Sequence, residues 1–220
     1  MGGSSPVIHV RRPAVVSMAD VEWTPSPHLQ AGAEKVWERL CHQNPHAFDG
    51  RLVHVAGVHR NGAGGATVQV FPCAYRWYAA QVADPQCDLG CRPLGVKGYT
   101  LCEGKVLLGR RASWTMYGAD LFEFAPSGGV EPGSSAEDSI LREFNEEAGG
   151  TLRCLQNVAV IFDEDAKSWE IIFRIETSNM SLSPSTDEYQ ELEWFDPDAL
   201  PDGLTPIAER MRNLGILTRS

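Results

Sequence analysis

A glycine-rich loop that runs into an acidic helix, residues 128–149, constrains this chain more than any other segment. Three of its acids, Glu143, Glu146 and Glu147, stand at relative positions 0, 3 and 4, a spacing that places side chains on one face of an α-helix. At roughly 4 Å and an effective dielectric constant near 20, each like-charge pair costs on the order of 4 kcal/mol before solvent and salt relax it. A hard cation that prefers oxygen ligands would offset that cost, so the spacing predicts a divalent metal site.

The rest of the helix supports this interpretation. At about 100° per residue the acids occupy one arc of the helix, and the neighbouring arc is apolar, formed by Ile140, Leu141, Phe144 and Ala148. One stripe can therefore pack while the other stays free for chemistry. Arg142 lies one turn from both Asp138 and Glu146, so we expect it to hold a carboxylate in position or to face a phosphate.

The ends of the helix are also marked in the sequence. Ser134 precedes Glu137 by three residues, which is the spacing of a capping box, and glycines 149–150 are a natural stop. Taken alone, an acidic helix is most often an ordinary solvated surface helix. Gly128, Gly129 and their neighbours change that balance, because a glycine loop lets the backbone approach a ligand or metal closely.

The segment resembles the box of the Nudix hydrolases, which reads Gly, five residues, Glu, seven residues, Arg-Glu, two residues, Glu-Glu, one residue, Gly and an aliphatic residue. The residues in register are Gly128, Arg142, Glu143, Phe144, Glu146, Glu147 and Gly149. Two positions depart from the pattern: Ser134 replaces the first Glu, and Gly150 replaces the closing apolar residue. The Arg-Glu and Glu-Glu pairs that carry the chemistry are intact.

The resemblance implies magnesium or manganese held by Glu143, Glu146 and Glu147, with Glu143, Arg142 and Glu147 as the catalytic set. It also implies a further acid six residues before a late-strand tryptophan, and Glu188 precedes Trp194 at that distance. A solvated loop acid explains Glu188 equally well.

Substrate contacts are predicted on both sides of the box. We expect the loop glycines Gly128 and Gly129 to approach the substrate with their backbone. Arg110 and Arg111 are candidates for its phosphates, although strand-edge solubility explains these arginines equally well.

Composition narrows the class of protein. A length of 220 residues with 43% hydrophobic residues suits one domain with an extension, and the formal charge of −10 argues against general nucleic-acid binding. No run is apolar enough to cross a membrane, and residues 1–17 lack a secretory pattern. The six cysteines have irregular spacing, which favours reduced thiols in a cytoplasmic protein.

The predicted fold is α/β (α+β), an alpha-beta-alpha sandwich with a mixed sheet, as the resemblance implies, preceded by an N-terminal α/β extension. We expect a flexible tail at 1–22, the extension at 23–94 and the Nudix domain at 95–217. All six histidines precede residue 60, so general-base work in the Nudix half falls to a carboxylate, a metal-activated water or both.

The predicted function is metal-dependent hydrolysis of a nucleoside diphosphate linked to another group. A Pro-x-x-Phe-Asp-Gly step at 45–50 and a following hairpin and Tyr-bearing helix resemble Nudix proteins that hydrolyse UDP-glucose, which favours a nucleoside diphosphate sugar such as UDP-glucose or ADP-ribose. The alternatives are a catalytically silent nucleotide-sugar sensor and a house-cleaning nucleoside triphosphate pyrophosphohydrolase. The partner is then a small-molecule nucleotide, with either a homodimer or the N-terminal region of the same chain completing the pocket.

Overall fold

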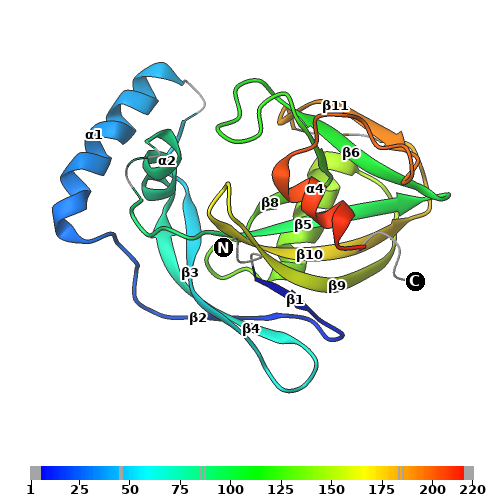
Figure 1. Cartoon of the computed structure of the whole chain (residues 1–220), viewed down its shortest axis with the longest axis horizontal. Helices are drawn as coiled ribbons and strands as arrows, with labels where there is room; N and C mark the ends of the chain where they lie inside the picture. Colours follow the sequence, from blue (N-terminus) through cyan, green and yellow to red (C-terminus); the bar gives the residue numbers. More distant parts are fainter. Residues whose placement is uncertain are drawn as a thin grey trace.

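A large mixed sheet forms the centre of the molecule (Figure 1). The computed structural model describes residues 6–44, 47–84, 86, 88–182, 184 and 186–215. The strands of the large sheet follow one another in space as β1 (Val7–His9), β9 (Leu152–Asp163), β10 (Ser168–Thr177), β5 (Leu94–Cys102), β6 (Lys105–Arg111) and β11 (Tyr189–Phe195). Strand β10 runs parallel to β5 and antiparallel to β9, so the prediction of a mixed sheet is confirmed.

Two short strands attach the glycine loop to this sheet. Strand β7 (Phe122–Phe124) pairs with β6, and β8 (Ser127–Gly129) pairs with β5. Because β8 ends at Gly129, the loop leaves the sheet beside the middle strand β5. The sheet thereby fixes where the acidic helix begins.

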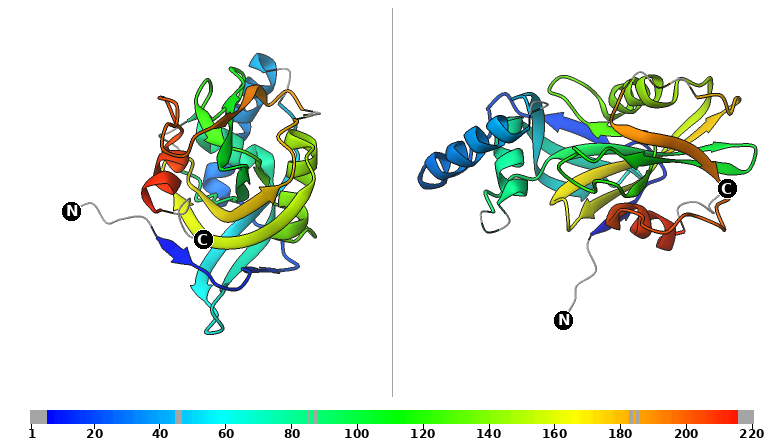
Figure 2. Two further views of the ribbon diagram at one scale, coloured as in Figure 1. Left: turned by 90° about the vertical axis from the view of Figure 1, so that its right-hand side faces the viewer. Right: turned by 90° about the horizontal axis from the view of Figure 1, so that it is seen from above.

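Helices cover both faces of the large sheet, as Figure 2 shows. Helix α3 (Ala136–Glu143) and the π-helical turn η1 (Phe144–Ala148) pack on one face through Ile140 and Phe144. Helix α4 (Pro206–Asn213) packs on the other face through Ile207 and Met211. The predicted alpha-beta-alpha sandwich is therefore the observed architecture, a mixed α+β fold with few helices.

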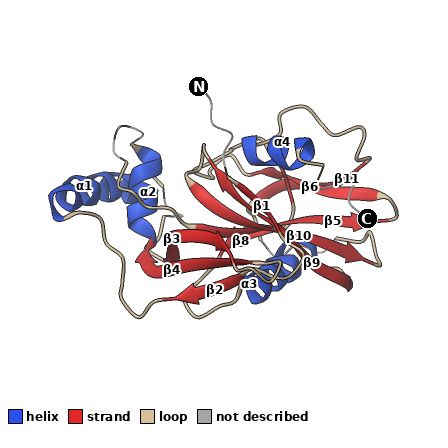
Figure 3. Ribbon diagram, turned by 60° about the horizontal axis from the view of Figure 1, so that its bottom comes forward, coloured by secondary structure: helices blue, strands red, loops and turns tan. Residues whose placement is uncertain are grey.

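The N-terminal region forms a smaller layer beside the sandwich (Figure 3). Its sheet has the order β2 (Val15–Met18), β4 (Ala66–Ala74), β3 (Arg51–Arg60), and its helices are α1 (Pro27–Gln43) and α2 (Tyr75–Ala83). The predicted hairpin, formed by β3 and β4, and the predicted Tyr-bearing helix, α2, are present. Val53, Val68 and other apolar residues of this small sheet share a core with Ile140 and Phe144 of the acidic helix. The two regions therefore pack as neighbours around common apolar contacts.

Two short paired strands lie within residues 1–22, where a flexible tail is predicted. Strand β1 pairs antiparallel with β9, placing Val7 opposite Ile161, and β2 pairs parallel with β4, placing Val15 opposite Thr67. Both strands are short and their partners lie far away in the sequence, so their stability comes from the ladder rather than from a local pattern. Residues 1–5 lie outside the described residues, and the other domain boundaries stay predictions.

None of the helices in the described ranges is both long and apolar enough to cross a membrane.

Candidate functional site

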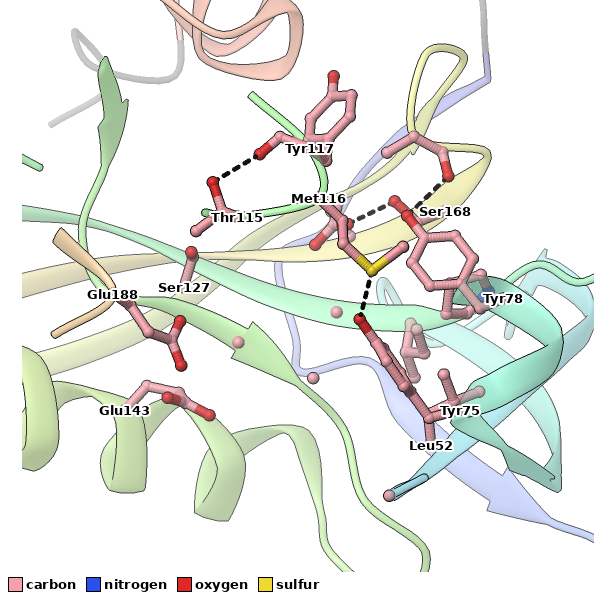
Figure 4. Close-up of a pocket in the computed structure, with 18 of the residues that line it drawn as sticks. Leu52, Tyr75, Tyr78, Thr115, Met116, Tyr117, Ser127, Glu143, Ser168 and Glu188 are labelled. Carbon is pink, nitrogen blue, oxygen red and sulfur yellow. Dashed lines mark hydrogen bonds between the residues drawn. The ribbon is translucent and has the colours of Figure 1, made fainter. Parts of the chain in front are cut away.

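A cavity of about 570 Å³ lies between the N-terminal region and the Nudix-like region. Phe48, Leu52, Tyr75 and Tyr78 line it from the N-terminal side, and residues of the large sheet, the glycine loop and the acidic helix line it from the other. Figure 4 shows Glu143 and Glu188 at one end, and Tyr75 and Tyr78 toward the other. The N-terminal region therefore lines the cavity within one chain. This is one of the two predicted ways of completing the pocket, the other being a homodimer.

The acidic helix starts one residue later than the sequence suggested. Ser135, rather than Ser134, is the N-cap: its hydroxyl accepts from the backbone N–H of Asp138 at 3.0 Å, and the Asp138 carboxylate accepts from the Ser135 N–H at 3.4 Å. The capping box is thus Ser135–Asp138, and the predicted pair of Ser134 and Glu137 is wrong. The motif tolerates the shift because both registers place an acid at the third position of the helix.

The last turn of the acidic helix is π-helical, and its two acids differ in burial. Residues 144–148 form η1, and the N–H of Gly149 bonds the carbonyl of Phe144 at 2.9 Å, an i to i+5 bond. A 100° projection therefore does not hold beyond Glu143. Glu143 and Glu147 are buried, 9% and 1% exposed, whereas Glu146 is exposed to solvent. Gly149 ends the helix in the left-handed conformation, as predicted.

Glu147 is the most deeply buried acid of the helix. Its Oε2 accepts a hydrogen bond from the backbone N–H of Ser127 at 3.0 Å, whereas its Oε1 is buried and has no hydrogen-bond partner among the described residues. Burial, reinforced by the neighbouring charge of Glu143, raises the pKa of Glu147 well above its usual value. A buried oxygen with a free lone pair is what a cation ligand requires before the cation binds.

Glu143 lies against the glycine loop, where Gly128 leaves room for it. A Cβ atom on Gly128 would overlap the Glu143 carboxyl group, so only glycine allows this approach. Arg142 donates to Glu143 at 2.8 Å and to Glu131 at 2.9 Å, rather than to the predicted partners Asp138 and Glu146. Burial raises the pKa of Glu143 to about 7, although Arg142 opposes the shift.

The remaining predicted residues divide between the cavity and the surface. Gly128, Gly129, Arg111 and Glu188 line the cavity, and Figure 4 shows the Glu188 carboxylate facing Glu143 from the segment before β11. Arg110 does not line it: this side chain lies on the surface of β6, 3.7 Å from Glu191, because neighbouring strand residues point to opposite faces.

A buried network of charged side chains, centred on Glu123, lines the cavity beside Arg111. This network was not predicted from the sequence. Glu123, 1% exposed on β7, forms ion pairs with Lys97, at 2.7 Å, and with Arg111. Ser127 donates to the same carboxylate at 3.0 Å. Burial alone would raise the pKa of Glu123, but the two cations outweigh it and hold the pKa at about 2. The sequence does contain a signal for this network, because Glu123 is a single acid between two phenylalanines of a short strand.

Tyr75 links the two sides of the cavity at its apolar end. Its hydroxyl donates to the sulfur of Met116 at 3.3 Å, which joins α2 to the loop between β6 and β7 (Figure 4). Phe48, on the N-terminal side of the same cavity, is 74% exposed. Pro45 and His46 of the predicted Pro-x-x-Phe-Asp-Gly step lie outside the described residues.

The acids of the site are suitable ligands for a hard divalent cation, although their carboxyl groups do not converge on a single point. The described ranges contain no group of three or more His, Cys, Asp or Glu side chains close enough together to hold a metal. Yet Glu147 offers a buried free oxygen, and Glu143 and Glu188 face each other nearby. Carboxylate oxygens are the ligands that Mg²⁺ and Mn²⁺ prefer. The donor set therefore fits the predicted ion.

Comparison with known proteins identifies the family. The model of the NUDIX domain matches residues 92–215, more than half of the chain, and the chain therefore belongs to the NUDIX family. Nudix hydrolases generally use divalent metal ions.

A curated relative, the NAD-capped RNA hydrolase NudC of Pseudomonas fluorescens, is 35% identical over 75 residues. The match spans 34% of this chain and 27% of that protein, so it covers only about a quarter of the relative.

Solved structures with a similar fold include a NUDIX-family hydrolase from Clostridium perfringens. It has a TM-score of 0.46 and 18% identity, over 58% of this chain and 99% of that chain. The NUDIX domain of Shewanella oneidensis NrtR, in complex with ADP ribose, has a TM-score of 0.48 and 17% identity, over 61% and 94% of the two chains.

Proposed function

We propose that this protein is a metal-dependent pyrophosphohydrolase of a nucleoside diphosphate linked to another group, and in particular of a nucleoside diphosphate sugar such as UDP-glucose or ADP-ribose. The products are a nucleoside monophosphate and a sugar phosphate. The observation that carries the proposal is a single cavity lined by Glu143 and Glu188 at one end and by the aromatic side chains Phe48 and Tyr75 on its N-terminal side, with Glu147 buried beside Glu143.

The acidic end is suited to a diphosphate only when a cation is present. Glu143, Glu147 and Glu188 would otherwise repel the phosphates. Glu143, Glu146, Glu147 and Glu188 are the residues that we assign to magnesium or manganese. When bound, the ion neutralises charge on the diphosphate and lowers the pKa of an attacking water.

The chain's own groups then divide the remaining work. Glu143 is our candidate for the base that takes the proton of the attacking water, because its carboxyl lies against the loop at Gly128 and has a pKa near 7 before metal binds. Arg142 holds Glu143 in position. As water oxygen joins phosphorus, the anhydride bond breaks and its bridging oxygen leaves with the second phosphate.

The size of the cavity suits a substrate with groups on both sides of the diphosphate. A volume of about 570 Å³ accommodates a ligand larger than inorganic pyrophosphate. The exposed ring of Phe48 and the ring of Tyr75 offer apolar surface for a nucleobase. This arrangement supports a nucleotide sugar over a small phosphorylated metabolite.

A second substrate candidate is a dinucleotide cap. The relative from Pseudomonas fluorescens is named an NAD-capped RNA hydrolase, and NAD is also two groups joined by a diphosphate. The net charge of −10 disfavours binding of a long RNA body, so we place NAD-like dinucleotides second.

A cytoplasmic location is part of the same proposal. Cys41, Cys73, Cys91, Cys102 and Cys154 are free thiols, and Cys87 lies outside the described residues. Free thiols are typical of a reducing compartment.

The test is a substrate panel with Mg²⁺ and with Mn²⁺. UDP-sugars, ADP-ribose, NAD(H), diadenosine polyphosphates and nucleoside triphosphates are assayed for phosphate-bearing products. We expect turnover of a nucleotide sugar, and at least a 1,000-fold loss, on the order expected for a metal ligand, in Glu147→Gln. Glu137→Gln, at an exposed acid of the same helix, is the matched control. Full turnover by Glu147→Gln, or silence across the whole panel, contradicts the proposal.

A further inference from the structure

Another buried acid, Glu170, lines the cavity from a strand of the large sheet rather than from the acidic helix. It lies on β10, is 7% exposed, and has no part in the diphosphate chemistry proposed above. Ser168, on the same strand, donates its hydroxyl to Glu170 Oε1 at 2.6 Å. Figure 4 places Ser168 beside Tyr78, at the opposite end of the cavity from Glu143 and Glu188. The hydrogen bond from Ser168 thus holds the Glu170 carboxyl group at the wall of the cavity.

A glycine on the neighbouring strand makes room for this carboxyl group. Gly95 of β5 stands directly opposite Glu170 in the parallel ladder, and a Cβ atom on Gly95 would overlap Oε2 of the Glu170 carboxyl group. Gly95 itself lines the cavity, and its backbone has no positive φ that would demand glycine. The absence of a side chain at position 95 therefore serves the placement of the Glu170 carboxyl group.

The groups around Glu170 leave it short of a cationic partner. Lys97 of β5 is nearby, but its ammonium group donates to Glu123 of β7. Asp163 of β9 adds negative charge, and Tyr78 of α2 donates to the carbonyl of Ala166. Burial raises the pKa of Glu170 to about 7, and Lys97 and Ser168 only partly oppose this. Near neutral pH the carboxyl group is therefore able both to donate and to accept hydrogen bonds.

We propose that Glu170, positioned by Ser168 and Gly95, is a specificity-determining residue that hydrogen-bonds hydroxyl groups of the substrate's sugar. This inference rests on the proposed function. A hydroxyl group donates and accepts, so it complements a carboxyl group in either protonation state. A phosphate is disfavoured here because Glu170, Asp163 and Glu123 are acidic and Lys97 is already paired.

The test combines a change in the enzyme with a change in the substrate. Wild type and Glu170→Ala are assayed on UDP-glucose and on UDP-sugars that lack one hydroxyl in turn, under Mg²⁺. We expect Glu170→Ala to raise KM roughly 10- to 100-fold, the range for a hydrogen bond to a charged group, with kcat changed less than about threefold. Removing the contacted hydroxyl should cost wild type a similar factor and cost Glu170→Ala almost nothing.

Two further variants test whether the position of the Glu170 carboxyl group matters, and not only its presence. Gly95→Ala keeps the Glu170 side chain but displaces its carboxyl group, so it should reproduce the KM effect, and the double variant should be no worse than Glu170→Ala. Glu170→Gln keeps the shape and the hydrogen-bonding capacity, so it should retain most of the affinity. The control is Glu176→Ala, a β10 glutamate outside the cavity whose partly exposed side chain pairs with Arg174.

The outcomes distinguish this inference from the proposed function. If wild type hydrolyses nucleotide sugars and each hydroxyl deletion costs Glu170→Ala the same factor as wild type, the role of Glu170 is refuted while the activity stands. If wild type neither hydrolyses nor binds any nucleotide sugar in calorimetry, both fall together. Thermal melts of each variant show whether a loss comes from unfolding.

Discussion

The carboxylate of Glu147 is held by the backbone N–H of Ser127 at 3.0 Å through one oxygen, and its other oxygen is buried with no donor in the described part of the chain. This half-satisfied state costs stability, because an ionised carboxylate is removed from water and receives one hydrogen bond in return. A cation at the free oxygen offsets the cost. The same side chain thus ties the stability of the metal-free protein to its proposed chemistry.

Replacement of Glu147 by glutamine should stabilise the metal-free protein at neutral and higher pH. The folded pKa of Glu147 is raised above its unfolded value, so the folded state binds the proton more tightly. Stability therefore falls as pH rises above about 4.5 and is lowest above the folded pKa. Glutamine removes this dependence. Thermal unfolding in a chelator at pH 5 and pH 8 should show a gain for Glu147→Gln that is larger at pH 8, and added Mn²⁺ should stabilise wild type alone.

A single methyl group on Gly128 should impair activity without unfolding the protein. Its Cβ atom would overlap the Glu143 carboxyl group, and the backbone there has no positive φ that would itself be strained. Gly128→Ala should therefore displace Glu143 and lower kcat by roughly 100-fold, the order expected for a misplaced catalytic group. Gly32→Ala, on α1 and outside the cavity, is a control, since no atom lies within 4 Å of its Cβ position and its φ is not positive. Equal activity of the two variants would show that Glu143 does not need this position.

Glu123 should be the acid whose loss most harms the fold. Replacing it with alanine leaves Lys97 and Arg111 in a buried site without their partner, which is expected to cost about 3–5 kcal/mol of unfolding free energy. The contribution of Glu123 to the free energy of unfolding changes with pH in the opposite direction to that of Glu147. The folded pKa, about 2, lies below the usual value, so the stabilisation is present above pH 4.5 and is lost as pH falls toward 2.

Urea unfolding at pH 7 and pH 3 measures this difference. The surface pair of Glu22 and Arg51 is the control, because both side chains are about half exposed and Glu22→Ala should cost less than about 1 kcal/mol. A loss at Glu123→Ala as small as at Glu22→Ala would mean that Lys97 and Arg111 find water or other partners.

The sequence predicts the acids of the site better than it predicts their directions. The spacing of Glu143, Glu146 and Glu147 marks the helix, but the π-helical turn that exposes Glu146 depends on the bond from Gly149 to Phe144, which no spacing reveals. The N-cap differs by one residue because Ser134 and Ser135 are chemically equivalent. Such choices are decided by packing of the whole helix rather than by local pattern.

Glu123 and Glu170 were not predicted from the sequence for a different reason. Glu123 and Glu170 are lone acids within apolar strands, and a one-dimensional pattern cannot show that Lys97 and Gly95 of β5 lie beside them. A charged residue in an otherwise apolar strand is nevertheless a usable signal, because burial of an acid requires a partner or a function. Strands of three or four residues, such as β1, leave no comparable signal.

Strand β1 should protect the large sheet from pairing with other chains. It is the outer neighbour of β9, and without it the twelve-residue β9 would present an open edge along part of its length. Ile8 pairs with Val160 at the centre of this ladder. Ile8→Pro removes a donor and fixes φ, so it should detach β1, lower the melting temperature by several degrees and promote aggregation on heating.

Light scattering during a thermal ramp measures the aggregation of Ile8→Pro and of wild type. The control is Val15→Thr, an exposed β-branched replacement on β2, which should change neither value. If Ile8→Pro melts and scatters like wild type, β1 contributes nothing to the edge that it covers.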